Sequence, residues 1–303
     1  MAVDVNAWVP EEWGGAVVTK FTNTSAVDRA TSRHEPMSTD VKHVPKAGDA
    51  DAYFIPKGQA YTLDDNAGDE LLLNARKIGV AVPLADEDIK DAAGFVNIVN
   101  AKKDAGASGT AILFDNAALA VTGAENGTTV PYTSVYAAAT NKSTVSTGAT
   151  AAAMRDAVLD AIAVAEDSEW SDESLAVIAS PAFRPHFRSI SADGSAGINV
   201  YDERGSSLAS YPIFWSRGAR LSATATQSPT AGAGLTGVAG NAILVVVPRR
   251  MLVVGDRERL MSQVTDAFTG PGALSDVAYL KMRTRKAFAL GDPAAASVLE
   301  IIA

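Results

Sequence analysis

The stretch Lys77–Ala93, KIGVAVPLADEDIKDAA, passes from a short apolar run into an acidic turn. We expect Ile78–Val82 to form a strand that stops at Pro83, because proline has no backbone N–H to donate to a sheet. The acids Asp86–Asp88 favour a helix start, where carboxylates lie near the positive end of the helix dipole. Apolar residues then recur at helical spacing, so the sequence predicts helix over residues 84–120, as one long helix or two stacked ones.

Before this strand, residues 48–76 carry the pattern of a long hairpin. Apolar residues 52–55 and 71–73 flank a stretch rich in Gly, Asn and Asp, which is typical of two strands joined by a turn. A two-stranded ribbon is barely stable by itself in water. We therefore expect this hairpin to lie on another surface.

The first 47 residues contain apolar anchors without a continuous pattern. Trp8 and Trp13 are scattered among polar residues, and no run is long enough to build a core of its own. A frayed terminus would explain this irregularity. Two tryptophans so close to the start favour instead an arm that docks its aromatic side chains elsewhere.

In the second half of the chain, helices and strands alternate. Residues 123–146 have the composition of a loop with a short strand near 130–136, and residues 149–167 carry the clearest helical stripe. Ser180 followed by Pro181 favours a helix start, since a capping side chain precedes a proline in the first turn. Strands are expected at 175–179, 211–215, 242–247 and 251–254. These elements predict an α+β protein.

The last long strand, predicted from Tyr279 to Phe288, has two different faces. Strand side chains alternate, so Lys281, Arg283 and Arg285 fall together on one face. Such a basic face is either solvated or paired with acids of another molecule, and the residues alone leave both possibilities open.

The composition excludes several classes of protein. The chain has 303 residues, 47% of them hydrophobic and 20% charged, which is the balance of a globular protein rather than a disordered one. It has no cysteine, which excludes disulfides, thiolate metal sites and a cysteine nucleophile. The formal net charge of −9 argues against wrapping duplex DNA by neutralising phosphates. No apolar run approaches the ~20 residues of a membrane span, and the acidic start is unlike a secretory signal, so we expect neither.

Catalytic and cofactor motifs are missing. The three histidines share no metal-ligand spacing. Gly232–Gly237 matches G-x-G-x-x-G, but the sequence predicts no strand before it and no helix after it, as a dinucleotide site requires. We therefore predict no catalytic, metal-binding or cofactor-binding residue. If the chain were nonetheless an enzyme, its best candidates would be His186 with Asp202 or Glu203.

The order of these elements resembles the major capsid protein of tailed bacteriophages, which has the Hong Kong 97-type capsid fold. Val9–Trp13 and Val44–Lys46 are similar to the family's N-terminal arm and first strands, and Lys77–Ala93 to the strand that leads into its spine helix. The tail from Ala278, AYLKMRTRKAFALGDPAA, looks like the family's closing strand. The resemblance covers nearly the whole chain and lies in the order of elements rather than in one motif.

The resemblance implies a division of the chain into four parts. They are residues 1–47, the N-terminal arm and first strands; 48–76, the extended E-loop hairpin; 77–148 with 255–292, the peripheral domain with its long spine helix; and 149–254 with the tail 293–303, the axial domain that gathers around five- and six-fold centres.

The function that the resemblance implies is to build the icosahedral shell around packaged double-stranded DNA, as pentamers and hexamers of one chain. Such a protein is no enzyme and needs no cofactor. Its partners would be further copies of itself, a portal, a separate scaffolding protein and, as an option, a decoration protein. It would enclose DNA without sequence-specific binding, contact no membrane, assemble in the host cytoplasm and end in the virion capsid.

The resemblance also implies where copies meet. The E-loop would lie over a neighbour's peripheral domain and bury its apolar residues there, while its acids could face the neighbour's basic strand. The expected contact residues are, on the E-loop, Tyr53, Phe54, Ile55, Lys57, Asp64, Asp65, Asp69 and Glu70; on the basic face, Lys281, Arg283 and Arg285; and, as anchors of the arm, Trp8 and Trp13.

Some members of the family crosslink an E-loop Lys to an Asn of a neighbour with the help of a Glu. Lys57 lies in the E-loop, but the Asn position falls near Asp276 and the Glu position near Arg283. Neither residue suits an isopeptide bond, so we expect a shell without crosslinks. The 47 residues before the E-loop are fewer than a fused scaffolding region would need, so we also expect no maturation cleavage.

Three other functions stay open. An encapsulin-type nanocompartment has the same fold and holds enzyme cargo instead of DNA, although nothing in the arm resembles the encapsulin start. A soluble enzyme would use the candidates named above. A phage tail or decoration protein would leave the pattern of the spine helix unexplained.

Overall fold

The structure is a computed structural model of the chain. Its described part covers two main sheets and the helices that pack on them. The described residues are 25–46, 54–55, 57, 69–85, 95–120, 124–125, 128–129, 132–168, 170, 174–192, 207–221, 238, 240–265 and 277–302.

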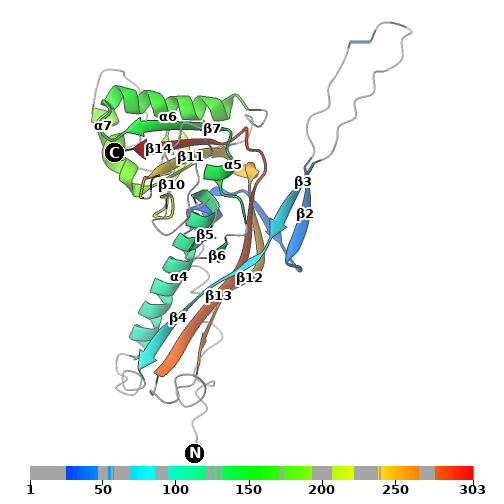
Figure 1. The fold of residues 1–303 in the computed structure, drawn as a ribbon, viewed down its shortest axis with the longest axis vertical. Coiled ribbons are helices and arrows are strands. Elements are labelled where there is room, and N and C mark those ends of the chain that lie inside the picture. Colours follow the sequence, from blue (N-terminus) through cyan, green and yellow to red (C-terminus); the bar gives the residue numbers. More distant parts are fainter. Residues whose placement is uncertain are drawn as a thin grey trace, which may run out of the picture.

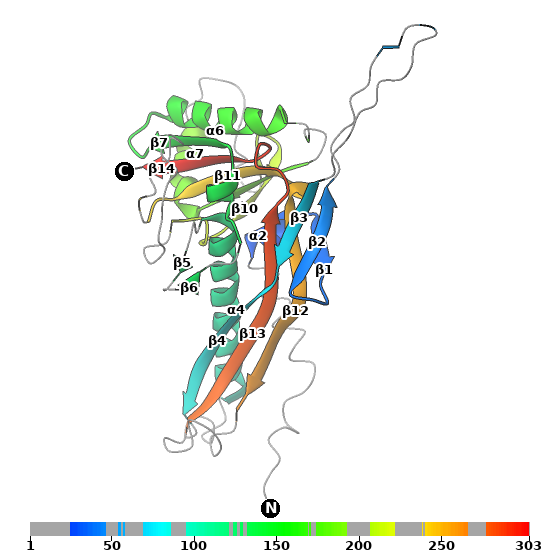
Figure 2. The ribbon, with the colours of Figure 1, turned by 45° about the vertical axis from the view of Figure 1, so that its right-hand side comes forward.

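Two sheets, one above the other, make up most of the fold (Figure 1). The upper body holds a six-stranded sheet of order β7-β14-β11-β8-β10-β9, and the lower part is a long four-stranded sheet of order β1-β12-β13-β4. Helix α4 (Phe95–Leu119) runs along the lower sheet and ends beneath the upper body. Seen from a second direction, the lower sheet is long, narrow and twisted (Figure 2).

Helices cover both faces of the six-stranded sheet. Its strands are β7 (Asn141–Ser146), β8 (Leu175–Ala179), β9 (Ser207–Leu208), β10 (Tyr211–Trp215), β11 (Ile243–Pro248) and β14 (Ser297–Ile302). β7 is parallel to β14 and β8 to β10, whereas β11 runs antiparallel to both β8 and β14. One face carries α6 (Ala151–Glu166), η2 (Pro181–Phe183) and α7 (Arg184–Ala192), and the other carries α2 (Ala26–Ala30) and α5 (Val135–Ala138).

The central strands of this sheet are continuous apolar runs because both of their faces are covered. Every residue of β8 and β11 is buried. On β8, Ile178 packs in the same core as α2 and α4, while Val177 points to the opposite core with α6 and α7. The side chains of Thr150 and Ser180 accept hydrogen bonds from the first turns of α6 and η2, and the helix start predicted at Ser180 is confirmed.

The four-stranded sheet packs one face on α4. Its strands are β1 (Arg33–Pro36), β4 (Arg76–Ala85), β12 (Leu252–Val264) and β13 (Val277–Leu290). β1 is parallel to β12, and the other neighbours are antiparallel. Leu280 and Met282 of β13 are buried with apolar residues of α4. Gly106 permits this close approach, since a Cβ added there would lie 2.8 Å from the sulfur of Met282.

A ribbon of two antiparallel strands, β2 (Val41–Lys46) and β3 (Asp69–Asn74), leaves the sheet at its upper end (Figure 1). Val44 and Leu73 on its inner face are buried against Val253 of β12 and Ala287 of β13. This contact supplies the supporting surface that an isolated ribbon lacks. A second, smaller ribbon pairs β5 (Ala124–Glu125) with β6 (Thr128–Thr129).

Strand β4 differs from the prediction that it stops at Pro83, because it continues to Ala85. β4 is the edge of its sheet, and an edge strand tolerates a residue without an N–H. The carbonyl of Pro83 accepts a hydrogen bond from Lys102 Nζ of α4 at 2.9 Å. The predicted first turn of the helix at Asp86–Asp88 lies outside the described residues.

The predicted strand near residues 130–136 is wrong. Its last two residues begin helix α5, where the Ser134 side chain accepts from the Ala137 N–H as an N-cap. The sequence does not predict strand β7, because NKSTVS is mostly polar. β7 lies at the edge of the sheet, where it pairs with β14 alone. The hairpin ladder also differs: residues 41–46 pair with 69–74, instead of 52–55 with 71–73.

Two strands, β12 and β7, do not fit the expected segment boundaries. β12 begins at Leu252, ahead of the boundary expected after residue 254. β7 lies in the upper sheet, although its residues fall in the segment assigned to the peripheral domain. The division into arm, E-loop, peripheral domain and axial domain stays a prediction.

Candidate intersubunit surfaces

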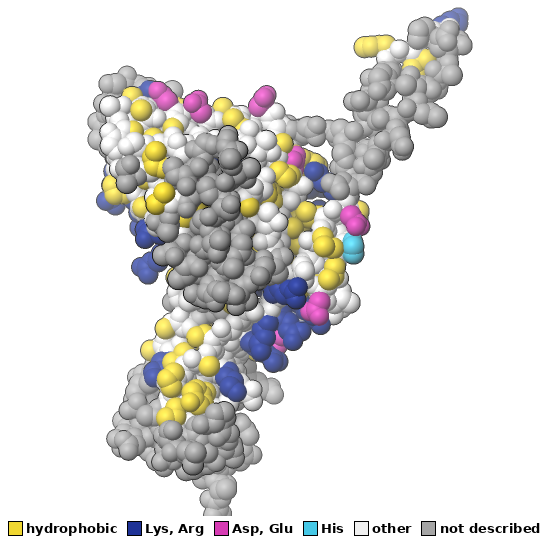
Figure 3. Space-filling model, viewed as in Figure 1, with side chains coloured by type: hydrophobic (Ala, Val, Ile, Leu, Met, Phe, Trp, Pro, Cys, Tyr) yellow, Lys and Arg dark blue, Asp and Glu magenta, His cyan; other side chains and the backbone are white. Residues whose placement is uncertain are grey.

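The structure places the predicted basic residues on one face of β13. Lys281 and Arg283 are exposed, while Met282 between them and Leu280 before them are buried under α4. Arg285 continues the same face and is half-buried. Figure 3 shows Lys and Arg side chains gathered over the middle of this sheet.

A hollow of about 790 Å³ lies on this part of the sheet. Cross-strand neighbours line it in register: Gly79 of β4 and Met261 of β12 stand on either side of Arg283. The β4 side of the hollow is lined by small residues, and Met261 on the β12 side remains 54% exposed. The hollow therefore combines cationic side chains with an exposed apolar one, which suits a polypeptide partner better than solvent alone.

One carboxylate of the same chain already faces these cations. Glu258 of β12 pairs with Arg283 Nε at 3.0 Å and with Arg285 Nε at 3.3 Å. Thr284 Oγ1 donates to the Glu258 carbonyl at 2.8 Å and ties the two strands together. Lys77 and Lys281, which both line the hollow, form no ion pair within the described ranges, so these two cations stay available to a partner.

The ribbon presents apolar side chains to solvent on its outer face. Leu72 is 51% exposed and Val41 42% exposed. His43, directly opposite Leu72 in the ladder, has its Nδ1 3.0 Å from a Glu70 carboxylate oxygen, so Glu70 has a partner in its own chain. Farther along the hairpin, Phe54 is exposed over its entire side chain, with a relative value of 106%. A fully exposed phenylalanine does not stabilise an isolated subunit, but it would stabilise a contact that buries it.

Other predicted contact residues divide into described and undescribed ones. Ile55 is half-buried, Lys57 is exposed, and Asp69 opens β3. The remaining ones lie outside the described residues: Trp8, Trp13, Tyr53, Asp64, Asp65 and Asp276.

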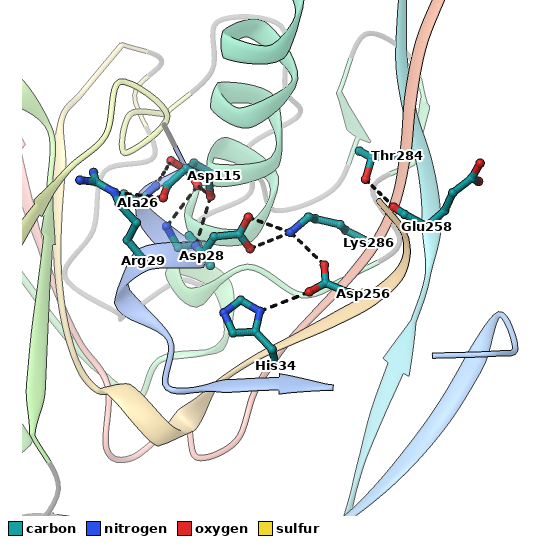
Figure 4. A network of polar contacts seen from close by, with 11 residues as sticks. Ala26, Asp28, Arg29, His34, Asp115, Asp256, Glu258, Thr284 and Lys286 are labelled. Carbon is teal, nitrogen blue, oxygen red and sulfur yellow. Dashed lines mark hydrogen bonds and ion pairs between the residues drawn. The ribbon is translucent and has the colours of Figure 1, made fainter. Parts of the chain in front are cut away.

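A buried polar network that the sequence did not reveal joins the N-terminal segment to the lower sheet (Figure 4). Lys286 Nζ of β13 donates to both carboxylate oxygens of Asp28, at 2.8 and 2.7 Å, and lies 3.0 Å from Asp256 of β12. His34 of β1 contacts the same Asp256 carboxylate at 3.3 Å. The first and last of these residues are 258 positions apart, so no local pattern could have signalled the pair.

The network changes the proton affinities of its members. Burial raises the pKa of Asp28, against the opposing effect of Lys286. The hydrogen bond to Asp256 raises the pKa of His34. Burial acts to raise the pKa of Asp256, but His34 and Lys286 together outweigh it and lower that pKa. The pKa values of the two carboxylates around Lys286 are thus shifted in opposite directions.

A second buried carboxylate, Asp115 of α4, connects three parts of the fold. Its oxygens accept from the hydroxyls of Ser25 at 2.6 Å and Ser216 at 2.6 Å, and from the backbone N–H groups of Ala26 and Val27. Burial raises the pKa of Asp115 to about 6 despite these hydrogen bonds. Asp115 therefore links helix α4 to the start of α2 and to the loop after β10.

The described residues contain no group of His, Asp or Glu side chains that could hold a metal ion. His186 is half-buried on α7, and its proposed enzymatic partners Asp202 and Glu203 lie outside the described residues. Within the described ranges, no helix is long and apolar enough to cross a membrane.

Comparison with known proteins gives no match in sequence and clear matches in structure. No family model and no curated protein matches the chain. A structure from Mycobacterium phage Ogopogo is 13% identical with a TM-score of 0.67, over 92% of each chain. The capsid of an empty GTA particle is 15% identical with a TM-score of 0.63, over 92% of this chain and 90% of that one. The capsid structure of the cyanophage P-SCSP1u is 15% identical with a TM-score of 0.60, over 89% and 86%.

These similarities establish the fold. The chain has the Hong Kong 97-type capsid fold, of class α+β, as the order of its sequence elements predicts. The agreement extends over nearly the whole length of both chains, so both sheets belong to the shared architecture.

Proposed function

We propose that this protein is the major capsid protein of a tailed bacteriophage, a structural subunit without enzymatic activity. The observation that carries the proposal is the structural match to phage capsids over about nine tenths of the chain. Copies of the chain assemble as pentamers and hexamers into an icosahedral shell. The shell encloses double-stranded DNA in the virion, after assembly in the host cytoplasm.

Exposed surfaces of the subunit support assembly with copies of itself. A closed shell requires several different contacts per subunit, because each copy meets neighbours within its ring and in adjacent rings. The fully exposed Phe54 and the exposed Leu72 and Met261 are apolar groups that such contacts would bury. The E-loop of one copy lies over the peripheral domain of the next and buries Tyr53, Phe54 and Ile55 there.

Charge also supports this contact. The hollow beside Lys281 and Arg283 receives the acids of a neighbour's E-loop, Asp64 and Asp65. Because Glu258 already accepts from Arg283, Lys77 and Lys281 contribute most of the attraction that is left for a partner. The tryptophans Trp8 and Trp13 anchor the N-terminal arm on another copy.

The acidity of the chain is compatible with a DNA container. With a formal net charge of −9, the subunit does not neutralise phosphates over an extended surface. A shell that repels its contents leaves the packaged DNA mobile. Sequence-specific DNA binding is therefore no part of the proposal. Its further partners are a portal, a separate scaffolding protein and, as an option, a decoration protein.

The direct test is to express the full chain alone and with its genomic neighbours, and to examine both preparations by negative-stain electron microscopy. Uniform icosahedral shells are expected in at least one of them, and nucleic acid inside them in the infected host. Shells that hold enzyme cargo would support an encapsulin-type function instead. A compact monomer in both preparations would overturn the shell function and return attention to His186.

A separate measurement tests the absence of a crosslink and of cleavage. Lys57 and Asp276 are an unsuitable isopeptide pair, so the subunits of the mature shell stay separate and full-length. The intact mass of the subunit from mature particles should equal that of the 303-residue chain. A covalent ladder or a shortened chain would contradict this.

A further inference from the structure

The upper body carries three exposed arginines near the junction of α7 with the end of β10. Arg184 opens α7, Arg188 follows one helical turn later, and Arg217 is the second residue after β10. All three side chains are exposed, and we call them the arginine patch. The Arg184 guanidinium lies 4.7 Å from the centre of the Trp215 ring, which fixes the start of α7 against the end of β10.

Among the described side chains, the arginine patch has no carboxylate partner. Within the described ranges, neither Arg188 nor Arg217 forms an ion pair. The whole chain has more acids than bases, with a formal net charge of −9, so such a cluster is not the average of its surface. Arginine beside a half-buried tryptophan is also the composition that dominates binding energy in protein interfaces.

The outer face of α6 carries the opposite charge. Asp156, Asp160 and Asp167 are exposed and spaced so that they share one side of the helix, and we call them the acidic ridge. The exposed residues between them are Ala163, Val164 and Glu166, and Glu166 already accepts a hydrogen bond from the Tyr211 hydroxyl. Asp156 pairs with Arg155, whereas Asp160 and Asp167 have no basic partner among the described side chains.

Helices α6 and α7 pack side by side on one face of the six-stranded sheet. Figure 3 shows acidic side chains along the top of the upper body, where α6 runs. Among the described side chains of one copy, no ion pair joins the arginine patch to the acidic ridge. A contact between two such different surfaces is head-to-tail, and repeating it either closes a ring or extends a filament.

We propose that the arginine patch of one subunit docks on the acidic ridge of α6 in the next subunit, and that this heterologous contact joins neighbours around each ring. The inference rests on the proposed shell function and names a charge pairing within it. It is independent of the E-loop contact, because no E-loop residue belongs to the patch or to the ridge.

Charge-swap variants of the full chain test the contact. One variant reverses the patch, Arg188→Glu with Arg217→Glu, and leaves Arg184 in place because it stacks on Trp215. The other reverses the ridge, Asp160→Arg with Asp167→Arg, near the C-terminal end of α6, where cations suit the helix dipole. A fourfold variant carries both reversals and restores opposite charges across every contact.

Each double variant is expected to raise the protein concentration needed for rings and shells by at least about tenfold, because attraction becomes repulsion. The fourfold variant is expected to assemble as the natural chain does. The conservative Arg188→Lys with Arg217→Lys keeps the charge and serves as the control. Native mass spectrometry and electron microscopy measure assembly, and circular dichroism of the unassembled subunit confirms that each variant folds.

The outcomes separate this contact from the shell function. If the natural chain forms shells and the double variants do so equally well, the contact is wrong and the function stands. If the fourfold variant fails to recover assembly while remaining folded, the pairing of these two surfaces is wrong. If the natural chain forms neither rings nor shells, the proposed function fails, and this contact fails with it.

Discussion

In the part of the chain that the structure describes, helices cover both faces of the six-stranded sheet but only one face of the four-stranded sheet. In the upper sheet, β8 and β11 are buried along their whole length. In the lower sheet, β13 alternates buried and exposed residues over its first half, and Lys281 and Arg283 point into an open hollow. The upper sheet can therefore stabilise itself, while the lower one presents a surface that another copy can complete.

The way each sheet is held also differs. The upper sheet is held by apolar side chains on both faces. The lower sheet is fastened to the N-terminal segment by the buried ion pair between Lys286 and Asp28. The predictions below test this difference, from the largest expected effect to the smallest.

The largest loss of stability is expected from Asp28→Ala. The substitution leaves Lys286 buried with only Asp256 beside it, and breaking a buried pair costs about 3–5 kcal/mol. Denaturant unfolding of the unassembled subunit measures the loss. The double variant Asp28→Leu with Lys286→Met, which removes both charges, should recover most of it. A double variant as unstable as the single one would show that the pair acts through something other than its charge.

A somewhat smaller loss is expected from Ile178→Ala in the middle of β8. This side chain is fully buried in the core shared by α2 and α4, and such a truncation costs about 2–5 kcal/mol through lost burial and the cavity left behind. Ile178→Val, which removes a single methylene, should cost about 1 kcal/mol. The same unfolding measurement checks both. Equal effects of the two variants would mean that the sheet is not packed as described.

The stability difference between the natural chain and Asp115→Asn should depend on pH. Because burial raises the folded-state pKa of Asp115 from 3.8 to about 6, its stabilising contribution is complete below pH 3.8 and is lost as the pH rises through 6. Relative to the variant, the natural chain should lose about 2 kcal/mol between pH 4.5 and 7. Unfolding at a series of pH values gives this difference. A constant difference across the range would contradict the raised pKa.

The smallest effect on the isolated subunit is expected from Met261→Ser. This side chain is already 54% exposed, so the free energy of unfolding should change by less than about 0.5 kcal/mol. Assembly should nevertheless weaken, because the open hollow loses its apolar group. Sedimentation of assembly mixtures separates shells from free subunits, with Met261→Leu as the control that keeps the apolar character. Normal assembly of the serine variant would remove this residue from the contact.

The sequence predicted those elements whose pattern is local. The apolar runs at 175–179 and 211–215, the capped helix start at Ser180 and the alternation along β13 are each visible in a few consecutive residues. β7 was missed because most side chains of this edge strand stay partly exposed, so its sequence contains no apolar run. The end of β4 was misplaced because proline interrupts the hydrogen-bond ladder of a central strand but is tolerated in an edge strand.

The polar contacts were beyond sequence analysis for a different reason. Alternation placed Lys281, Arg283 and Arg285 on one face, but their pairing with Glu258 depends on the register of β12 against β13, which includes bulges. The buried pair of Lys286 and Asp28 depends on how distant segments pack. Spacing along the chain carries no information about either contact.

The most direct test of the central claim is an electron cryo-microscopy reconstruction of the particle that the full chain forms. We expect a closed shell in which a second copy covers Phe54 and the hollow beside Lys281 and Met261. The open face of the four-stranded sheet is then buried. A shell in which that face stays open to solvent, or a chain that forms no ordered particle, would contradict it.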